Sequence, residues 1–132
     1  MSQQTINGSS RDKALIYLVD DQPLLLEYAE SSLQAEGYSF QKFNEPEEAL
    51  RAFLQAQNKP DLLISDFAME RMTGMELIEK CKRAHPSLKT IMVSGTAGAE
   101  ILHQSPVKID EFLAKPYPSA TLVDLVRRVL AG

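Results

Sequence analysis

The sequence predicts an α/β domain in which a parallel sheet is covered by helices on both faces. The chain has 132 residues, which is the usual length of one domain. Short apolar runs alternate with longer segments of helical periodicity, in the order βαβαβαβαβα. The connections between them are short, as such alternating units require. Together these three observations favour a single doubly wound domain.

Four apolar runs are predicted as strands that are buried on both faces. They cover residues 14–19, 62–65 and 90–94, with a weaker run at 111–114, and each is rich in Ile, Val, Leu or Phe. A fifth run, residues 38–43, mixes aromatic and polar residues with imperfect alternation. That pattern is typical of an edge strand.

The first two helices are predicted from their periodicity and their ends. Leucines at helical spacing indicate a helix over residues 22–36, which stops at Gly37. Asn44 is the expected N-cap of the second helix, with Glu47 three residues later. The apolar face of this second helix is formed by Ala49, Leu50, Phe53 and Leu54.

Two more helices are well marked, and the one between them is weak. Thr73 and Glu76 form a capping box ahead of an apolar stripe, and a final helix covers residues 119–130. In the fourth helical segment, Gly95 and Gly98 disfavour a helix and Pro106 cuts it. At most two turns are expected there, near residues 99–104.

Composition excludes several classes of protein. Apolar residues make up 44% of the chain and charged residues 24%, with a net charge of −4. A nucleic-acid-binding domain would need a basic face, and a membrane span would need a longer apolar run. Residues 1–12 are polar and predict a disordered arm rather than a leader, ahead of a folded domain over residues 13–132. The single cysteine, Cys81, fits a reducing cytoplasm.

Four of the apolar runs end in polar side chains that suit phosphate chemistry. Asp20 and Asp21 follow the first run, Asp66 the third, Ser94 the fourth and Lys115 the fifth. The carboxyl ends of parallel strands line the ligand crevice of an open α/β sheet, so these groups should converge. Two carboxylates about 4 Å apart repel by roughly 4 kcal/mol at an effective dielectric near 20. A hard divalent cation, Mg²⁺, is therefore the expected partner of the acids.

This set of groups can transfer a phosphoryl group without a general base. An ionised carboxylate can attack phosphorus directly and form an acyl phosphate. Catalysis is then positioning and neutralisation of the oxygens of the phosphoryl group. We expect Mg²⁺ to take one oxygen, the Lys115 ammonium a second and the Ser94 hydroxyl a third.

The motifs VDD, LLISDFAMERMTGMEL, IMVSG and FLAKP, taken in order, resemble the receiver domain of bacterial response regulators. The resemblance covers about residues 14–130. It implies a flavodoxin-like fold whose five-stranded parallel sheet has the order 2-1-3-4-5. It also implies a phosphorylated signalling switch of a two-component system or phosphorelay.

The resemblance assigns roles to the strand-end residues. Asp66 corresponds to the phosphoryl acceptor. Asp20 and Asp21 correspond to the acidic pair that binds Mg²⁺ together with Asp66 and the backbone carbonyl of Ala68. Lys115 corresponds to the lysine that pairs with the acceptor and then with the phosphoryl group.

Further roles concern the switch. Ser94 corresponds to the switch hydroxyl and Phe112 to the switch aromatic residue, which turns inward when Ser94 moves to the phosphoryl group. The bond from Lys115 to Pro116 is expected to be cis. Phe112 has no hydroxyl, so its switch would be steric only.

Three departures from the family pattern change what is expected. Glu70 and Thr73 replace the proline and the second aspartate of the family loop, while the neighbouring methionines and Gly74 match. Ala68 stands where many relatives carry a polar side chain beside the attacking water. Self-dephosphorylation should therefore be slow. The weak fourth helix alters the usual surface for partners.

The first functional hypothesis is a phospho-accepting receiver, a switch that catalyses its own phosphorylation rather than a turnover enzyme. Its donor would be a phosphohistidine on a histidine kinase or phosphotransfer protein, and its output a change in affinity for a downstream protein partner. A weak homodimer is compatible with this hypothesis. The last residue, Gly132, follows the last helix directly, as expected for a single-domain form or for a piece of a longer protein.

Three other functions compete with this hypothesis. A pseudo-receiver that only docks proteins would require a failed metal site, and the sequence shows no such lesion. A phosphatase with an aspartyl nucleophile needs a second acid where Ala68 stands. A flavin-binding domain of similar topology needs a first loop rich in hydroxyl groups and glycine, unlike DDQPLL.

Overall fold

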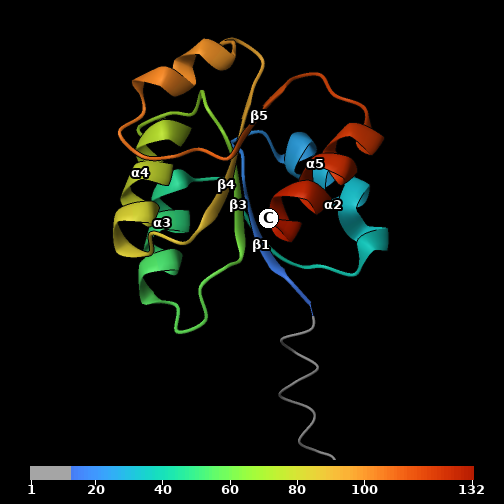
Figure 1. Ribbon diagram of the computed structural model, residues 1–132, viewed down its shortest axis with the longest axis horizontal. Helices are drawn as coiled ribbons and strands as arrows, with labels where there is room; N and C mark the ends of the chain where they lie inside the picture. The colour runs from blue at the N-terminus through green and yellow to red at the C-terminus, as the bar shows by residue number, and fades with distance from the viewer. Residues whose placement is uncertain (1–12) are drawn as a thin grey trace, which may run out of the picture.

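The computed structural model describes residues 13–132, and the arm predicted over residues 1–12 lies outside the described residues. The domain is built on a five-stranded, all-parallel sheet in the order β2-β1-β3-β4-β5, which confirms the predicted order (Figure 1). Edge strand β2 pairs only with β1, as its mixed pattern predicted. The strands are β1 (Leu15–Val19), β2 (Ser39–Phe43), β3 (Leu62–Asp66), β4 (Lys89–Ser94) and β5 (Glu111–Ala114).

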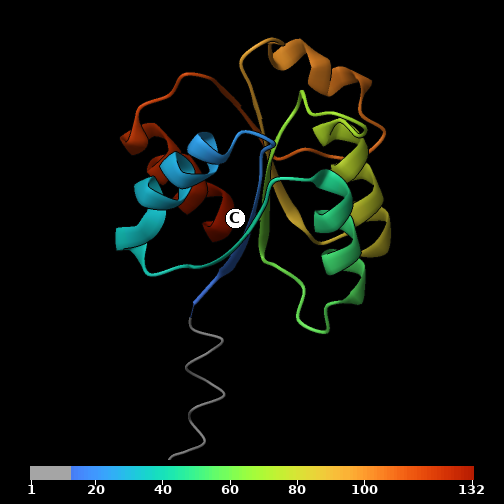
Figure 2. The ribbon, with the colours of Figure 1, turned by 180° about the vertical axis from the view of Figure 1, so that it is seen from behind.

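Helices cover both faces of the sheet, α2 and α5 on one side and α3 and α4 on the other (Figures 1 and 2). No helix within residues 13–132 has both the length and the apolar character needed to cross a bilayer. The helical elements are α2 (Pro23–Leu33), the 3₁₀ segment η1 (Gln34–Glu36), α3 (Pro46–Gln55), α4 (Gly74–Ala84), the 3₁₀ segment η2 (Ala99–Gln104) and α5 (Ser119–Ala131).

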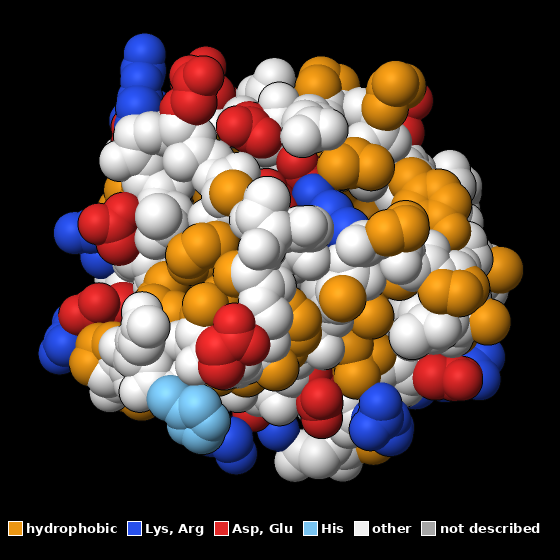
Figure 3. Space-filling view, turned by 90° about the horizontal axis from the view of Figure 1, so that it is seen from above, with side chains coloured by type: hydrophobic (Ala, Val, Ile, Leu, Met, Phe, Trp, Pro, Cys, Tyr) orange, Lys and Arg blue, Asp and Glu red, His pale blue; other side chains and the backbone are white. Residues whose placement is uncertain are grey.

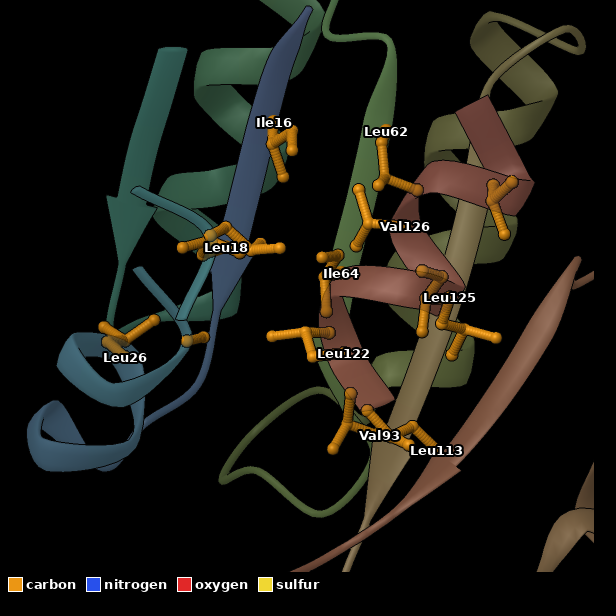
Figure 4. Close-up of a cluster of buried hydrophobic side chains, with 14 residues drawn as sticks. Ile16, Leu18, Leu26, Leu62, Ile64, Val93, Leu113, Leu122, Leu125 and Val126 are labelled. Atoms are coloured by element: carbon orange, nitrogen blue, oxygen red, sulfur yellow. The ribbon is translucent and has the colours of Figure 1, made fainter. Parts of the chain in front are cut away.

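Alternation along the strands divides the core into two layers. In β1, Ile16 and Leu18 pack toward α2 and α5, whereas Tyr17 and Val19 pack toward α3 and α4. Figure 4 shows the first layer, in which side chains of four strands meet those of α2 and α5. Full burial of one such aliphatic side chain contributes about 1.5–3 kcal/mol, so these layers fix the strand ends in place.

Two helix starts were predicted from local capping, with opposite outcomes. Thr73 is the N-cap of α4, and its capping box with Glu76 is formed in both directions, at 3.1 and 2.9 Å. The prediction of Asn44 as the N-cap of α3 is wrong. Glu45 occupies that position in an extended conformation without a side-chain cap. Pro46 starts the helix instead, because its fixed φ and missing N–H suit the first helical position.

Other helical predictions also meet the structure with mixed results. The prediction that Leu54 lies on the buried face of α3 is wrong, because Leu54 is 52% exposed. The predicted first helix is regular only to Leu33, and its last turn is the 3₁₀ segment η1 before Gly37, whose φ is +85°. The short fourth helix is confirmed, because η2 forms 3₁₀ turns only over Ala99–Gln104.

At the amino end of the sheet, two aspartates join neighbouring strands. Asp61 donates its backbone N–H to the Leu15 carbonyl at 2.8 Å, and its carboxylate accepts the Leu15 N–H at 2.8 Å. Asp110 makes the same pair of bonds with Thr90, at 3.1 and 2.8 Å. These bonds satisfy backbone groups where two pairs of strands begin.

Candidate functional site

Three carboxylates meet at the carboxyl edge of the sheet. Asp20 and Asp21 directly follow β1, and Asp66 ends β3. One carboxylate oxygen from each lies within 4.8 Å of the other two. Asp20 and Asp66 are buried, at 8% and 5% exposure, and Asp21 is half-buried. Figure 3 looks down on this edge, where acidic and basic side chains meet near the centre beside apolar ones.

Lys115 lies between two of these carboxylates. It directly follows β5, and its Nζ atom is 2.9 Å from Asp20 Oδ2 and 3.0 Å from Asp66 Oδ1. The predicted convergence of Asp20, Asp21, Asp66 and Lys115 is therefore present in the structure. One ammonium faces three carboxylates, so the cluster carries excess negative charge when all of them are ionised.

The surroundings shift the pKa values of Asp66 and Lys115. Burial raises the pKa of Asp66, and the charges of Asp20 and Asp21 add to this, while the hydrogen bond from Lys115 opposes it. For Lys115, burial alone lowers the pKa, but its hydrogen bonds to Asp20 and Asp66 and their charges outweigh burial and raise it. Lys115 is therefore held in its charged form.

Backbone contacts hold the acids in position. Asp20 Oδ1 accepts a hydrogen bond from the Gln22 N–H at 3.0 Å, which ties the first acid to the start of α2. The Asp66 carbonyl accepts from Ser65 Oγ at 2.9 Å. A Cβ atom at Gly74 would lie 2.2 Å from that same carbonyl oxygen. Glycine is therefore required at position 74, where α4 begins against the acceptor strand.

The loop between β3 and α4 is held by its own backbone. Arg71 adopts φ of +75°, which is uncommon for a residue with a side chain, and the Met72 N–H donates to the Glu70 carbonyl at 2.8 Å. The Gly74 N–H donates to the Phe67 carbonyl at 2.9 Å and closes the loop. Ala68 is exposed in this loop, two residues after Asp66. Its role as a carbonyl ligand stays a prediction.

The two predicted switch residues make other contacts in this structure. Ser94 is 1% exposed, and its Oγ accepts hydrogen bonds from the N–H groups of Thr96 at 3.1 Å and Ala97 at 2.9 Å. Among residues 13–132, the Ser94 hydroxyl makes no hydrogen bond to Asp66. Phe112 pairs with Met92 across β4 and β5 and packs, half-buried, against the core under α3 and α4. Their switch roles stay predictions.

Tyr117 also belongs to this site, although the sequence did not single it out. A cavity of about 20 Å³ between α2 and the sheet is lined by Asp20, Asp66, Lys115 and Tyr117, together with apolar side chains. Burial, then the nearby charges of Tyr28 and Asp20, raise the pKa of Tyr117 to about 12. The peptide bond between Lys115 and Pro116 is cis, as the resemblance implied. The position of Tyr117 two residues after Lys115 is the one sequence signal that points to it.

The donor set fits Mg²⁺. All three side chains offer carboxylate oxygens, which a hard cation prefers, and they are close enough to share one ion. Two of the carboxylates are buried, where their mutual repulsion is weakly screened. A divalent cation would offset the charge that Lys115 leaves unbalanced.

Comparison with known proteins agrees with this geometry. The sequence profile of the response regulator receiver domain matches residues 16–127. The chain is 30% identical over 118 residues to the nitrogen assimilation regulatory protein NtrX of Azorhizobium caulinodans, and covers 26% of its length. It is 29% identical over 118 residues to the sensor kinase CckA of Brucella abortus, and covers 12% of its length. These alignments span 87% and 89% of the chain.

Solved receiver structures share the whole fold. A CheY-like receiver domain protein from Methanospirillum hungatei JF-1 superposes with a TM-score of 0.79 at 27% identity, covering 90% of this chain and 94% of that one. The receiver domain of NtrX from Brucella abortus gives 0.79 at 25% identity, covering 88% and 98%. The chain therefore belongs to the family of response regulator receiver domains of two-component signal transduction.

Proposed function

We propose that this domain is a phospho-switch in which Asp66 accepts a phosphoryl group in a reaction that requires Mg²⁺. One observation carries the proposal: the buried Asp66 carboxylate lies 3.0 Å from the Lys115 ammonium and within 4.8 Å of ligand oxygens from Asp20 and Asp21. A nucleophile, a charged donor and a metal-binding pair thus surround one point. Membership of the receiver family supports these assignments.

Each side chain has a distinct task in the transfer. An Asp66 oxygen attacks the phosphorus of a phosphohistidine, the P–N bond breaks, and the imidazole nitrogen leaves with the electron pair. Lys115 gives up its contact with Asp66 and donates to a phosphoryl oxygen. Asp20, Asp21, Asp66 and the Ala68 carbonyl would hold Mg²⁺, which supplies charge neutralisation at the phosphoryl oxygens when it is bound.

The same step would move the switch residues. Ser94 Oγ accepts hydrogen bonds from the Thr96 and Ala97 N–H groups, which leaves its own O–H available to donate to a phosphoryl oxygen. A movement of Ser94 toward the phosphoryl group would strain those two bonds and shift the loop between β4 and η2. Phe112 would then turn inward, a purely steric movement because it has no hydroxyl. A downstream partner would bind the altered surface formed by β4, η2 and β5.

The proposed donor is a histidine kinase or a phosphotransfer protein. The relatives are named as a sensor kinase and as a regulatory protein, which supports a donor of this kind.

Intact mass spectrometry after incubation with acetyl phosphate and Mg²⁺ tests the proposal. We expect one phosphoryl adduct on the wild-type protein, lost in EDTA and lost in Asp66→Ala. Asp124→Ala is the matched control, because Asp124 is exposed on α5 and should keep the adduct. Absence of both the adduct and Mg²⁺ binding in the wild type would instead identify a pseudo-receiver that only docks other proteins.

A further inference from the structure

The loop that carries Lys115 is held on two sides. Its residues 115–118 connect β5 to α5, and two of the four are prolines. On the sheet side, the Lys115 N–H donates to the Ser94 carbonyl at 2.8 Å, so the start of the loop follows β4. The position of the Lys115 ammonium therefore depends on what holds the rest of the loop.

Helix α2 supplies the second attachment. The Tyr28 hydroxyl donates to the Tyr117 carbonyl at 2.9 Å, across 89 residues of sequence. The two rings also pack together, with centroids 5.4 Å apart and planes inclined by 51°. Tyr28 is 40% exposed, yet it makes both contacts with a residue two positions after Lys115. Ring packing and the hydrogen bond together restrict this loop.

A group of hydroxyls fixes the position of Tyr28 itself. Ser119, the first residue of α5, donates from its Oγ to the Tyr28 hydroxyl at 3.3 Å. Ser32 Oγ lies 2.7 Å from Ser119 Oγ and donates to the Tyr28 carbonyl at 2.8 Å. The contact therefore joins α2 to the start of α5 as well as to the loop between them.

Tyr117 transmits this attachment to the acceptor site. It shares the lining of the small cavity with Asp20, Asp66 and Lys115, so its place affects the space around the acceptor. A loop released from α2 would let Tyr117 and Lys115 move together. A displaced ammonium would lengthen and weaken its contacts with Asp20 and Asp66, which are now 2.9 and 3.0 Å.

We infer that Tyr28 is a positioning residue for phosphotransfer, because its hydroxyl holds the Tyr117 carbonyl and thereby sets Lys115 against Asp66. The inference rests on the proposed function and extends it to a residue outside the carboxylate cluster. None of the hydrogen bonds of Tyr28 within residues 13–132 goes to a carboxylate of that cluster. It acts through the loop.

The test compares Tyr28→Phe, which removes only the hydroxyl, with the wild type and with Tyr38→Phe. Tyr38 is a suitable control because it is half-buried on the same face of the sheet, and its hydroxyl makes no hydrogen bond within residues 13–132. Three quantities are measured: the rate of phosphorylation by acetyl phosphate, the Mg²⁺ concentration giving half the maximal rate, and hydrogen exchange of the Lys115, Tyr117 and Ser119 amides.

In Tyr28→Phe we expect the maximal rate to fall about three- to tenfold, the effect of losing one hydrogen bond at a positioned group. The half-saturating Mg²⁺ concentration should stay unchanged, because the carboxylates keep their places, and exchange of the three amides should accelerate. Tyr38→Phe should match the wild type in all three. A merely structural role for Tyr28 would not separate the maximal rate from the Mg²⁺ dependence.

Other outcomes overturn the inference. An unchanged maximal rate in Tyr28→Phe, or an equal loss in Tyr38→Phe, removes the positioning role. A wild-type protein that takes no phosphoryl group would defeat the proposed function separately. In that case hydrogen exchange alone would test whether Tyr28 holds the loop. Unchanged exchange of the Lys115, Tyr117 and Ser119 amides in Tyr28→Phe would show that it does not.

Discussion

At the amino end of the sheet, Asp61 and Asp110 each accept a backbone hydrogen bond from a neighbouring strand, whereas at the carboxyl end three aspartates gather and two of them, Asp20 and Asp66, share Lys115. The carboxylates at the amino end are far apart in sequence, and each has its own N–H donor. The carboxylates at the carboxyl end lie within 4.8 Å of one another. Aspartate side chains thus join neighbouring strands at the amino end of the sheet and concentrate negative charge at its carboxyl end.

The difference shows where stability and function lie in this fold. A carboxylate that accepts a backbone N–H stabilises the sheet, because it satisfies a buried donor. A carboxylate crowded against two others costs stability until a cation binds. The carboxyl end is therefore prepared to respond to Mg²⁺ and to a phosphoryl group, and the amino end is not. Four substitutions test this contrast.

Lys115→Met should have the largest effect on stability. Removing the ammonium leaves Asp20 and Asp66 buried together without a cation, which we expect to cost about 3 kcal/mol of unfolding free energy in EDTA. Added Mg²⁺ should restore part of the loss, because it replaces the missing positive charge. Urea denaturation with and without Mg²⁺ measures both values.

Lys108→Met is the control for Lys115→Met. The Lys108 side chain is 79% exposed and lies 3.7 Å from Asp110, so its loss should change stability little, and Mg²⁺ should not alter the result. Equal losses of unfolding free energy in the two variants would show that the carboxylates at the carboxyl end do not repel one another more than isolated surface charges do.

Asp110→Ala should cost about 2 kcal/mol of unfolding free energy, because the Thr90 N–H is left without its acceptor where β4 meets β5. Asp110→Asn keeps one acceptor oxygen and should lose less. Both variants should bind Mg²⁺ with the wild-type affinity, since the substitution lies at the opposite end of the sheet. A changed Mg²⁺ affinity in a titration would argue against independent ends.

Asp66→Asn should raise the unfolding free energy in EDTA by about 1 kcal/mol near neutral pH, since it removes one charge from the crowded cluster. The pKa of Asp66 is raised in the folded state, so its favourable contribution is present below its ordinary pKa of 3.8 and is lost as pH rises through the raised value. The advantage of the variant should therefore shrink as the pH falls.

Denaturation of Asp66→Asn and wild-type protein in EDTA at several values between about pH 4 and pH 7 measures this difference. Asp124→Asn, on the exposed surface of α5, is the matched control and should show no such trend. A gain in unfolding free energy of Asp66→Asn over the wild type that grows toward acid pH would contradict the raised pKa of Asp66.

Ala68→Asn should have the smallest effect, a phosphoryl lifetime shortened by about threefold, which corresponds to less than 1 kcal/mol. Ala68 is exposed two residues after Asp66, and its methyl group cannot hydrogen-bond an attacking water. Decay of the adduct after removal of the phosphodonor gives the lifetime. An unchanged or longer lifetime in the variant would refute an effect of this position.

Much of the fold follows from local patterns in the sequence. The buried strands β1, β3 and β4 read as continuous apolar runs, whereas the prediction that residues 111–114 are buried on both faces is wrong, because β5 is an edge strand that pairs only with β4 and is largely not buried. Thr73 with Glu76 marked the start of α4 correctly, because capping is decided within one turn. The glycines and Pro106 likewise predicted the short η2 segment. Asn44 was misread, because a favourable capping residue competed with Pro46 for the first turn of α3. The prediction for Leu54 failed because helical periodicity indicates which side of α3 is apolar, whereas only the packing of the helix decides how many residues on that side are buried.

The candidate site was predictable for a related reason. Parallel strands place their carboxyl ends along one edge, so Asp20, Asp66 and Lys115 were expected together before any distance was known. The hydrogen bonds of Ser94 to the Thr96 and Ala97 amides were not foreseen, because they depend on the path of the loop after β4. No local pattern marked Tyr28, whose partner is 89 residues away.

The sequence by itself determined the kinds of group at the strand ends and the order in which the chain delivers them, because strand periodicity and capping are local properties. The tertiary structure decided which groups touch. It placed Lys115 between Asp20 and Asp66, and it brought Tyr28 into contact with Tyr117. It also set the carboxylates of Asp61 and Asp110 against backbone N–H groups of neighbouring strands. Those choices depend on sheet register and on the packing of α2 against α5, which couple residues distant in sequence.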